Sequence, residues 1–156
     1  MEYILLLTAC INPDGMPFTC LADVGVRKKQ YIEALNFYLK NTTRKIVFVE
    51  NSGTDISSSF KDFQHRIEFL CFDGNLCFDK RKGKGYGEAL ILEYAMAKSE
   101  FITDDVLIFK LTGRLQLINI NRLIHYMDKL SPSKNFVCVV PPQNLSLIHI
   151  SEPTRH

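Results

Sequence analysis

The sequence predicts an α/β fold of the Rossmann-like kind, with a mainly parallel sheet and helices on both of its faces. Short apolar runs alternate along the chain with longer segments whose apolar residues recur every three or four positions. These are the patterns of buried strands and of amphipathic helices. Turn-forming residues such as Gly, Asn and Asp follow several of the apolar runs. Strict alternation of strand and helix favours right-handed crossovers and one parallel sheet.

The first half of the chain begins with a continuous apolar run at residues 3–9, as expected of a strand that is buried on both faces. The long segment 27–40 repeats its apolar side chains at helical spacing, and we expect its charged residues, including Arg27, to face solvent. The predicted elements of this half are strand 3–9, helix 27–40, strand 46–49, a short helix from Asp55 or Ser57 to about Phe63, and strand 66–72.

The second half opens with a basic loop that contains three glycines and leads directly into a helix. Two further apolar runs and one more amphipathic segment follow, so the alternation of strand and helix continues. The predicted elements of this half are loop 80–87, helix 87–99, strand 106–109 with a loop at 110–114, helix 119–129 and strand 136–140.

Composition excludes several classes of protein. The chain has 156 residues, 46% hydrophobic and 23% charged, which is typical of a soluble globular domain. A net charge of +2 gives no electrostatic case for nucleic-acid binding and allows at most peripheral membrane association. The N-terminal apolar run is too short to span a bilayer. Five cysteines without a CxxC pair indicate free thiols, and we expect a cytoplasmic location.

The last residues differ in character from the rest of the chain. Residues 145–155 resemble, codon by codon, the translation of a transposase-type sequencing-library adapter. We therefore expect residues 1–144 to belong to one ligand-binding domain and residues 145–156 to be a non-native tail. On this interpretation the natural reading frame continues beyond Asn144, and the domain is truncated.

Candidate ligand contacts lie in the loops after the predicted strands, because ligands of parallel α/β sheets bind at the carboxyl ends of the strands. One such loop contains Cys10, Ile11, Asn12 and Pro13. Another contains Glu50, Asn51 and Ser52, in which the carboxylate of Glu50 can accept hydrogen bonds from ribose hydroxyls or from N–H groups of a base. A plain strand-to-helix turn is the alternative interpretation of this second loop.

The basic loop is a candidate anion site. Glycines allow backbone N–H groups to approach an anion, and the helix that follows adds positive potential at its N-terminus. Lys82 and Lys84 add formal charge. The spacing fits neither a P-loop nor a dinucleotide-binding fingerprint. A flexible surface loop is the alternative interpretation.

Two cations follow the fourth predicted strand. Lys110 and Arg114 flank Thr112 and Gly113, and two fixed positive charges can neutralise a diphosphate as a metal ion would. The adjacent pair Asp104 and Asp105 precedes the strand, at the wrong end of the sheet for a ligand site. A β-turn with two solvated charges is the alternative interpretation.

These motifs together resemble those of GT-A glycosyltransferases. Residues 47–55 look like the acidic-Asn-Gly-Ser-Thr-Asp stretch of that family, although the order here is Ser-Gly. Residues 82–88 resemble the loop and helix that precede the family's diphosphate-binding strand. The Asp-x-Asp metal motif expected at 109–114 is missing, and the Lys-x-Thr-Gly-Arg string resembles glycosyltransferase-like proteins of capsule and lipopolysaccharide gene clusters. The resemblance covers about residues 3–140.

The resemblance implies the donor-binding half of an enzyme that transfers a sugar from a nucleotide-sugar to a glycan or lipid-linked acceptor in cell-surface polysaccharide synthesis. Without an Asp-x-Asp pair, a divalent metal is not expected, and no cofactor is evident. A general base is not assigned, and we expect this chain alone to be inactive. The implied nucleotide-sugar contacts are Cys10, Ile11, Asn12, Pro13, Glu50, Asn51, Ser52, Lys84, Lys110, Thr112 and Arg114.

Two other functions remain open from the sequence. A sugar nucleotidyltransferase has the same layout of elements but carries a glycine-rich basic loop after its first strand, whereas no Lys or Arg occurs here before Arg27. A non-catalytic relative of the fold that only binds a partner is the other alternative. Nucleotide binding separates these possibilities, because the first would prefer a triphosphate and the second would bind none.

Overall fold

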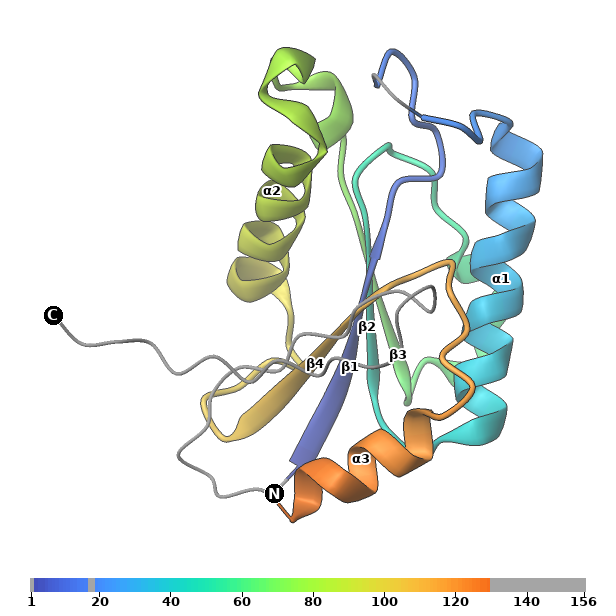
Figure 1. Cartoon of the computed structure of the whole chain (residues 1–156), viewed down its shortest axis with the longest axis vertical. Helices are drawn as coiled ribbons and strands as arrows, with labels where there is room; N and C mark the ends of the chain where they lie inside the picture. Colours follow the sequence, from blue (N-terminus) through green and yellow to red (C-terminus); the bar gives the residue numbers. More distant parts are fainter. Residues whose placement is uncertain (1, 17–18, 130–156) are drawn as a thin grey trace, which may run out of the picture. The chain divides into compact units, whose positions relative to one another are not determined.

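The computed structural model describes residues 2–16 and 19–129, and the described part of residues 1–118 forms one α/β unit. A sheet of four parallel strands, in the order β3-β2-β1-β4, runs through this unit (Figure 1). The strands are β1 (Glu2–Ala9), β2 (Ile46–Glu50), β3 (Ile67–Cys71) and β4 (Val106–Thr112). The predicted α/β class and the parallel sheet are confirmed for these residues.

Strand β1 is central, and every one of its residues after Glu2 is buried. Its unbroken apolar sequence follows from this position, because a strand covered on both faces has no side for polar residues. The register places the carboxyl ends of three strands at one edge of the sheet. Ala9 pairs with Glu50 on β2, and Thr8 pairs with Thr112 on β4.

Helix α1 (Val24–Asn41) covers one face of the sheet. It begins three residues earlier than predicted because the side chain of Asp23 caps its first turn, accepting a hydrogen bond of 2.8 Å from the backbone N–H of Val26. Its buried side includes Tyr31, whose ring meets that of Phe48 edge-on with 5.8 Å between the ring centroids. The predicted helical periodicity is therefore confirmed.

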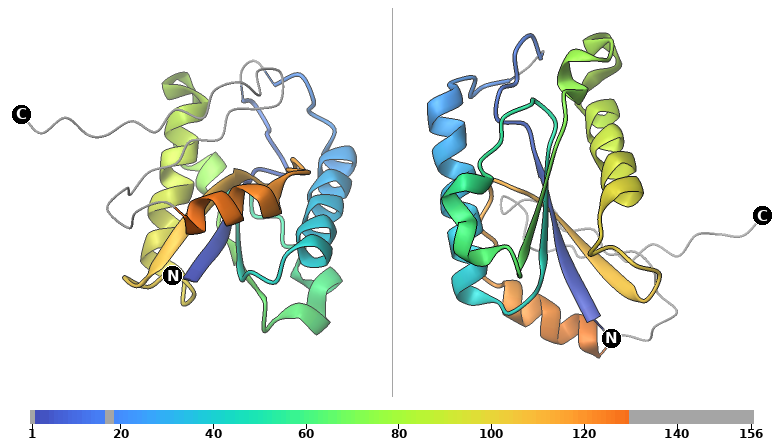
Figure 2. Two further views of the ribbon diagram at one scale, coloured as in Figure 1. Left: turned by 60° about the horizontal axis from the view of Figure 1, so that its bottom comes forward. Right: turned by 180° about the vertical axis from the view of Figure 1, so that it is seen from behind.

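Helix α2 (Gly83–Lys98) covers the opposite face, as the two views in Figure 2 show. Ile91 and Ala95 on this helix pack against side chains that point from β1 and β2 toward the same face. Helices on both faces of the sheet are therefore confirmed within this unit. The buried members of this second core are Ile4, Leu6, Val47, Val49, Ile91 and Ala95.

Short 3-10 helices connect the larger elements, and those in the described residues are η1 (Ser57–Phe63), η2 (Gly74–Leu76) and η3 (Lys80–Lys82). The first matches the short helix predicted to end at Phe63. The last corrects the prediction of a loop at 80–87, because the chain turns through η3 and enters α2 at Gly83. The side chain of Asp79 stabilises this turn by accepting a 3.0 Å hydrogen bond from the backbone N–H of Arg81.

Strand β4 is longer than the predicted 106–109 and continues to Thr112, because its pairing with β1 continues that far. Lys110 and Thr112 therefore lie within the strand instead of in a loop. Both are exposed, and Leu111 between them is buried, in the alternation expected of a strand with two different faces.

Residues 119–156 form a second unit, of which the structure describes 119–129. Helix α3 (Ile120–Asp128) agrees with the helix predicted at 119–129. The predicted strand 136–140 and the tail at 145–156 lie outside the described residues.

Within the described part of the chain, no helix is both long and apolar enough to cross a membrane.

Candidate functional site

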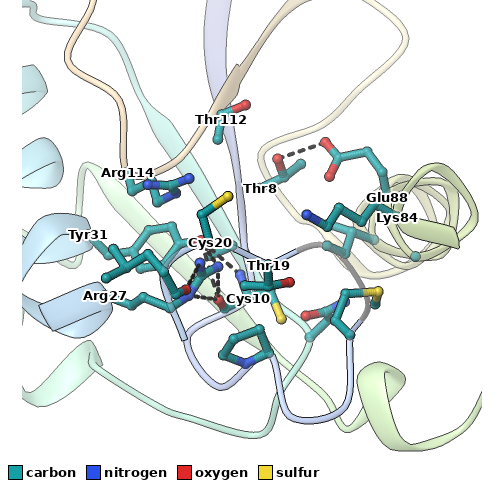
Figure 3. Close-up of a pocket in the computed structure, with 17 residues that line it drawn as sticks. Thr8, Cys10, Thr19, Cys20, Arg27, Tyr31, Lys84, Glu88, Thr112 and Arg114 are labelled. Carbon is teal, nitrogen blue, oxygen red and sulfur yellow. Dashed lines mark hydrogen bonds between the residues drawn. The ribbon is translucent and has the colours of Figure 1, made fainter. Parts of the chain in front are cut away.

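A cavity of about 430 Å³ lies at the carboxyl ends of β1 and β4. The chain passes from β1 to β2 on one side of β1 and reaches β4 on the other side, so the strand order reverses between β1 and β4. In open parallel sheets, such a reversal opens a crevice in which ligands bind. Residues from both helices and from the ends of β1, β2 and β4 line this cavity (Figure 3).

The two walls of the cavity carry most of its charge. Arg27, Tyr31 and Arg114 lie on one side, and Lys84 and Glu88 lie across from them on α2 (Figure 3). Among the described lining residues, three cations therefore face one carboxylate. This balance favours an anionic ligand.

The first turns of α2 strengthen this preference. Lys84, Gly87 and Glu88 all line the cavity, and no side chain caps the N-terminus of the helix at Lys82. Backbone N–H groups in an uncapped first turn are available to an anion, and the helix dipole adds partial positive charge at the same end.

Arg27 is buried, with 7% of its surface exposed, which corrects the prediction that it faces solvent. Its Nε and Nη2 donate to the carbonyl oxygen of Cys10, and its Nη1 donates to that of Leu21 at 3.1 Å. All these acceptors are neutral, and no carboxylate forms an ion pair with Arg27 in the described residues. A buried cation without an anionic partner is costly unless a ligand supplies the charge.

Cys10 is held from both sides of its backbone. Its N–H donates to the hydroxyl of Tyr31 at 3.0 Å, and its carbonyl accepts from Arg27. Burial raises the pKa of the Cys10 thiol to about 11, and the negative charge of Glu50 contributes to the rise. The thiol is therefore neutral at physiological pH, and it lines the cavity as a small, weakly polar group.

Glu50 does not line the cavity. Only 1% of its surface is exposed, and its carboxylate accepts hydrogen bonds from the backbone N–H groups of Ile11 at 2.8 Å, Ser52 at 2.9 Å and Thr54 at 2.8 Å. The hydroxyl of Ser52 and the thiol of Cys71 also donate to it. Glu50 thus joins the loops that follow β1 and β2.

Asn51, the residue after Glu50, does line the cavity, and only 3% of its surface is exposed. Its Oδ1 is buried and has no hydrogen-bond partner in the described part of the chain. The neighbouring Asn12 belongs to the framework: its N–H donates to the Ser52 hydroxyl at 2.9 Å, and its carbonyl accepts from the Asn75 amide at 3.0 Å. The Oδ1 of Asn75 also lacks a partner in these residues, but Asn51 is the one of the two that lines the cavity.

Lys110 is paired with Glu88 instead of facing the cavity. The same oxygen of Glu88 accepts a hydrogen bond of 2.8 Å from the hydroxyl of Thr8 on β1. Arg114, beyond the end of β4, donates to the side chain of Gln30 on α1 at 3.4 Å. The two cations predicted to act together are thus separated, because Arg114 lines the cavity and Lys110 pairs with Glu88.

The structure brings about half of the predicted contacts into one cavity. Those that line it are Cys10, Pro13, Asn51, Lys84, Thr112 and Arg114. Those that do not line it are Ile11, Asn12, Glu50, Ser52 and Lys110. Asp104 and Asp105 are exposed and precede β4, as predicted.

Sequence reasoning missed Arg27, Tyr31, Glu88 and Thr8, of which all four line the cavity. Arg27 belongs to a run of charges in which its neighbours are exposed, so composition alone does not single it out. Glu88 did carry a signal, because it lies one residue after the last glycine of the basic segment.

No cluster of three or more potential metal ligands is found among His, Cys, Asp and Glu of residues 2–16 and 19–129. No family model, curated protein or solved structure matches the chain. The fold and this cavity therefore carry the functional argument.

Proposed function

We propose that the cavity binds the nucleotide diphosphate of a nucleotide-sugar and that the chain is the donor-binding part of a glycosyltransferase. The enzyme would pass the sugar to a glycan or lipid-linked acceptor in cell-surface polysaccharide synthesis, in the cytoplasm. The observation that supports this is the position and charge of the cavity. It lies where the strand order of a parallel sheet reverses, and its lining residues include three cations and one carboxylate.

The diphosphate belongs at the charged end of the cavity. Lys84 approaches from the first turn of α2, and Arg114 approaches from the end of β4. Arg27 adds a third positive charge from the wall that also carries Arg114. Its hydrogen-bond partners are neutral, so this charge is not compensated. Fixed cations of this kind stabilise the charge that develops on a leaving diphosphate.

In this proposal the nucleoside lies near the end of β2, where Asn51 lines the cavity. Asn51 has an unpaired acceptor, which an N–H group of a base would satisfy. In this proposal Glu50 does not touch the nucleoside. It fixes the backbone of both loops so that their remaining side chains keep their positions.

Calorimetric titration of the 156-residue chain with UDP, GDP, CDP, CMP, UTP and GTP tests the proposal. We expect one nucleoside diphosphate to bind, with an affinity that falls as salt is added. Lys84→Met and Arg114→Met should each weaken this binding by about tenfold or more, since each removes a charged contact. Lys98→Met, an exposed lysine at the other end of α2, is the matched control and should have no effect.

The outcomes separate the alternatives. Stronger binding of UTP or GTP than of the diphosphates would favour a sugar nucleotidyltransferase. Absence of binding to every nucleotide in a folded sample would refute nucleotide recognition and favour a non-catalytic fold relative. Equal effects of the Lys84 and Lys98 substitutions would place the ligand outside this cavity.

A further inference from the structure

One carboxylate remains unexplained in a cavity suited to an anion. Glu88 lies on α2 and lines the cavity opposite Arg27 and Arg114 (Figure 3). A bare carboxylate here would repel a phosphate group, so its presence requires both a neutralising partner and a use. No other carboxylate lies among the described lining residues.

The neutralising partner is Lys110. Its ammonium group forms an ion pair with Oε1 of Glu88, and the hydroxyl of Thr8 donates to the same oxygen at 2.8 Å. Thr8 is almost fully buried on β1. Oε1 of Glu88 therefore links α2 to the ends of both β1 and β4. The lysine that the sequence suggests as a phosphate contact instead cancels the charge of Glu88.

The second oxygen of Glu88 has a different environment. No hydrogen bond to Oε2 is found in the described residues, and about 35% of the side-chain surface is exposed. A neutralised carboxylate oxygen at a cavity wall is an acceptor that tolerates a nearby phosphate. Neutral donors, either hydroxyls or amide-type N–H groups, satisfy a carboxylate acceptor without adding charge, and hydroxyls are the donors that a sugar ring offers.

We infer that Oε2 of Glu88 accepts a hydrogen bond from a hydroxyl of a sugar ring in the ligand, with Lys110 and Thr8 holding the carboxylate in place. This inference rests on the proposed function and adds a residue that selects for a hydroxylated ring. The hydroxyl is either the 2′-hydroxyl of the ribose or a hydroxyl of the sugar to be transferred. Glu88 is thus a specificity residue, and Lys110 is a positioning residue that acts through it.

A structural role alone predicts a different result. If Glu88 only ties α2 to the sheet, its loss would weaken the binding of all nucleotides equally through the shape of the cavity. If Oε2 contacts a hydroxyl, its loss would weaken the binding of only those ligands that carry this hydroxyl. The two roles are therefore separated by comparing ligands that differ by one sugar or one hydroxyl.

The test is a calorimetric titration of the whole chain and of Glu88→Ala with UDP, 2′-deoxy-UDP and UDP-glucose. The set GDP, 2′-deoxy-GDP and GDP-mannose replaces it if guanine is the base that binds. Glu93→Ala, an exposed glutamate on the same helix, is the matched control. Loss of a hydrogen bond to a charged group corresponds to about a tenfold loss of affinity or more.

Two results would support the inference and locate the hydroxyl. If Glu88→Ala weakens UDP-glucose relative to UDP, the hydroxyl belongs to the transferred sugar. If it weakens UDP relative to 2′-deoxy-UDP, the hydroxyl belongs to the ribose. The same change in affinity for all three ligands, or no change in any, would overturn the inference while the proposed function stands. Failure of the unmodified chain to bind any nucleotide would overturn both.

Lys110→Met provides a second and independent test. Removing the ammonium leaves the negative charge of Glu88 uncompensated beside the phosphates, so UDP binding should weaken by about tenfold. The double variant Lys110→Met with Glu88→Gln should recover UDP binding, because the repulsive charge is gone. Failure of the double variant to recover, with its circular dichroism spectrum unchanged, would contradict the neutralising role of Lys110.

Discussion

At the scale of single residues, one peptide group shows how this protein holds its cavity open. Arg27 donates to the carbonyl of Cys10, and Glu50 accepts from the N–H of Ile11. The carbonyl and the N–H belong to the same peptide bond, so a buried cation and a buried anion lie at opposite ends of one peptide dipole. Each charge is stabilised by hydrogen bonds, and the backbone at the end of β1 is fixed between them.

Glu50→Gln tests the framework role of this carboxylate. An amide keeps one acceptor but presents an NH₂ group to backbone N–H donors, so at least one buried donor loses its partner. We expect the free energy of unfolding to fall by about 2 kcal/mol, measured by urea denaturation. A role in the framework predicts equally weakened binding of UDP and GDP. A selective loss of one base would show instead that Glu50 contacts the nucleoside.

The sequence predicts the importance of Glu50 but not its direction. A carboxylate at the end of a buried strand is unusual enough to be noticed, and its neighbours Asn51 and Ser52 mark a loop. Whether such a side chain points into the cavity or back into the loops depends on the loop backbone. That backbone is set by Gly53, which has a φ of 73° and donates to the carbonyl of Phe72.

At the scale of elements, the close approach of β1 and β4 explains the glycine of the Lys-x-Thr-Gly-Arg string. The N–H of Gly113 donates to the carbonyl of Thr8 at 2.9 Å. A Cβ atom at this position would lie 2.8 Å from the same carbonyl oxygen and 3.2 Å from the ring of Tyr31. The glycine therefore lets the end of β4 reach β1 and places Arg114 at the cavity.

Gly113→Ala should be destabilising for this reason. A methyl group in contact with the Thr8 carbonyl and the Tyr31 ring pushes the end of β4 away from β1 and α1, at a cost of about 1–3 kcal/mol in the free energy of unfolding. Gly85→Ala is the matched control, because its Cβ would meet nothing within 4 Å and alanine favours the helix. Chemical denaturation should rank Gly85→Ala at or above the unmodified chain and Gly113→Ala below it. The reverse order would contradict this account of the strand end.

The boundaries of α2 and β4 were the least predictable parts of the described fold. Glycines at 83, 85 and 87 have low helix propensity, so the sequence indicates a loop where the structure has the first turns of α2. Lys110 and Thr112 are polar, so the apolar run that predicts the strand ends at Phe109. On a strand whose outer residues are exposed, polar side chains continue the strand without leaving any apolar signal.

At the scale of the whole molecule, the periodicity of the sequence predicts the class of fold because apolar runs alternate with amphipathic segments, as strands and helices do in a parallel α/β sheet. The strand order and the place of the cavity follow from which strands pair, and pairing leaves no trace in a single sequence. Charge shows the same limit. The cations that line the cavity come from three separate segments, and only the fold brings Arg27, Lys84 and Arg114 to one cavity.

The stability of the molecule in alkaline solution depends on the thiols around Glu50. Burial raises the pKa of Cys10 to about 11 and, together with the charge of Glu50, that of Cys71 to about 12, from an ordinary value of 9.0. Below pH 9 both thiols are protonated in the folded and unfolded chain. Between pH 9 and about 12 the unfolded chain releases these protons first, so the folded state loses stability as the pH rises.

We therefore expect the free energy of unfolding to fall between pH 9 and pH 11, measured by urea denaturation at several pH values. The double variant Cys10→Ser with Cys71→Ser is the control, because serine keeps a hydrogen-bonding group but does not titrate in this range. Its stability should fall less steeply over the same interval, since burial also raises the pKa of Tyr31 and of Tyr38 but the two thiols no longer contribute. Parallel curves for the two proteins would show that the folded thiols ionise as easily as unfolded ones. The Cys10–Ile11 segment would then be open to water, and the closed framework around Glu50 would be incorrect.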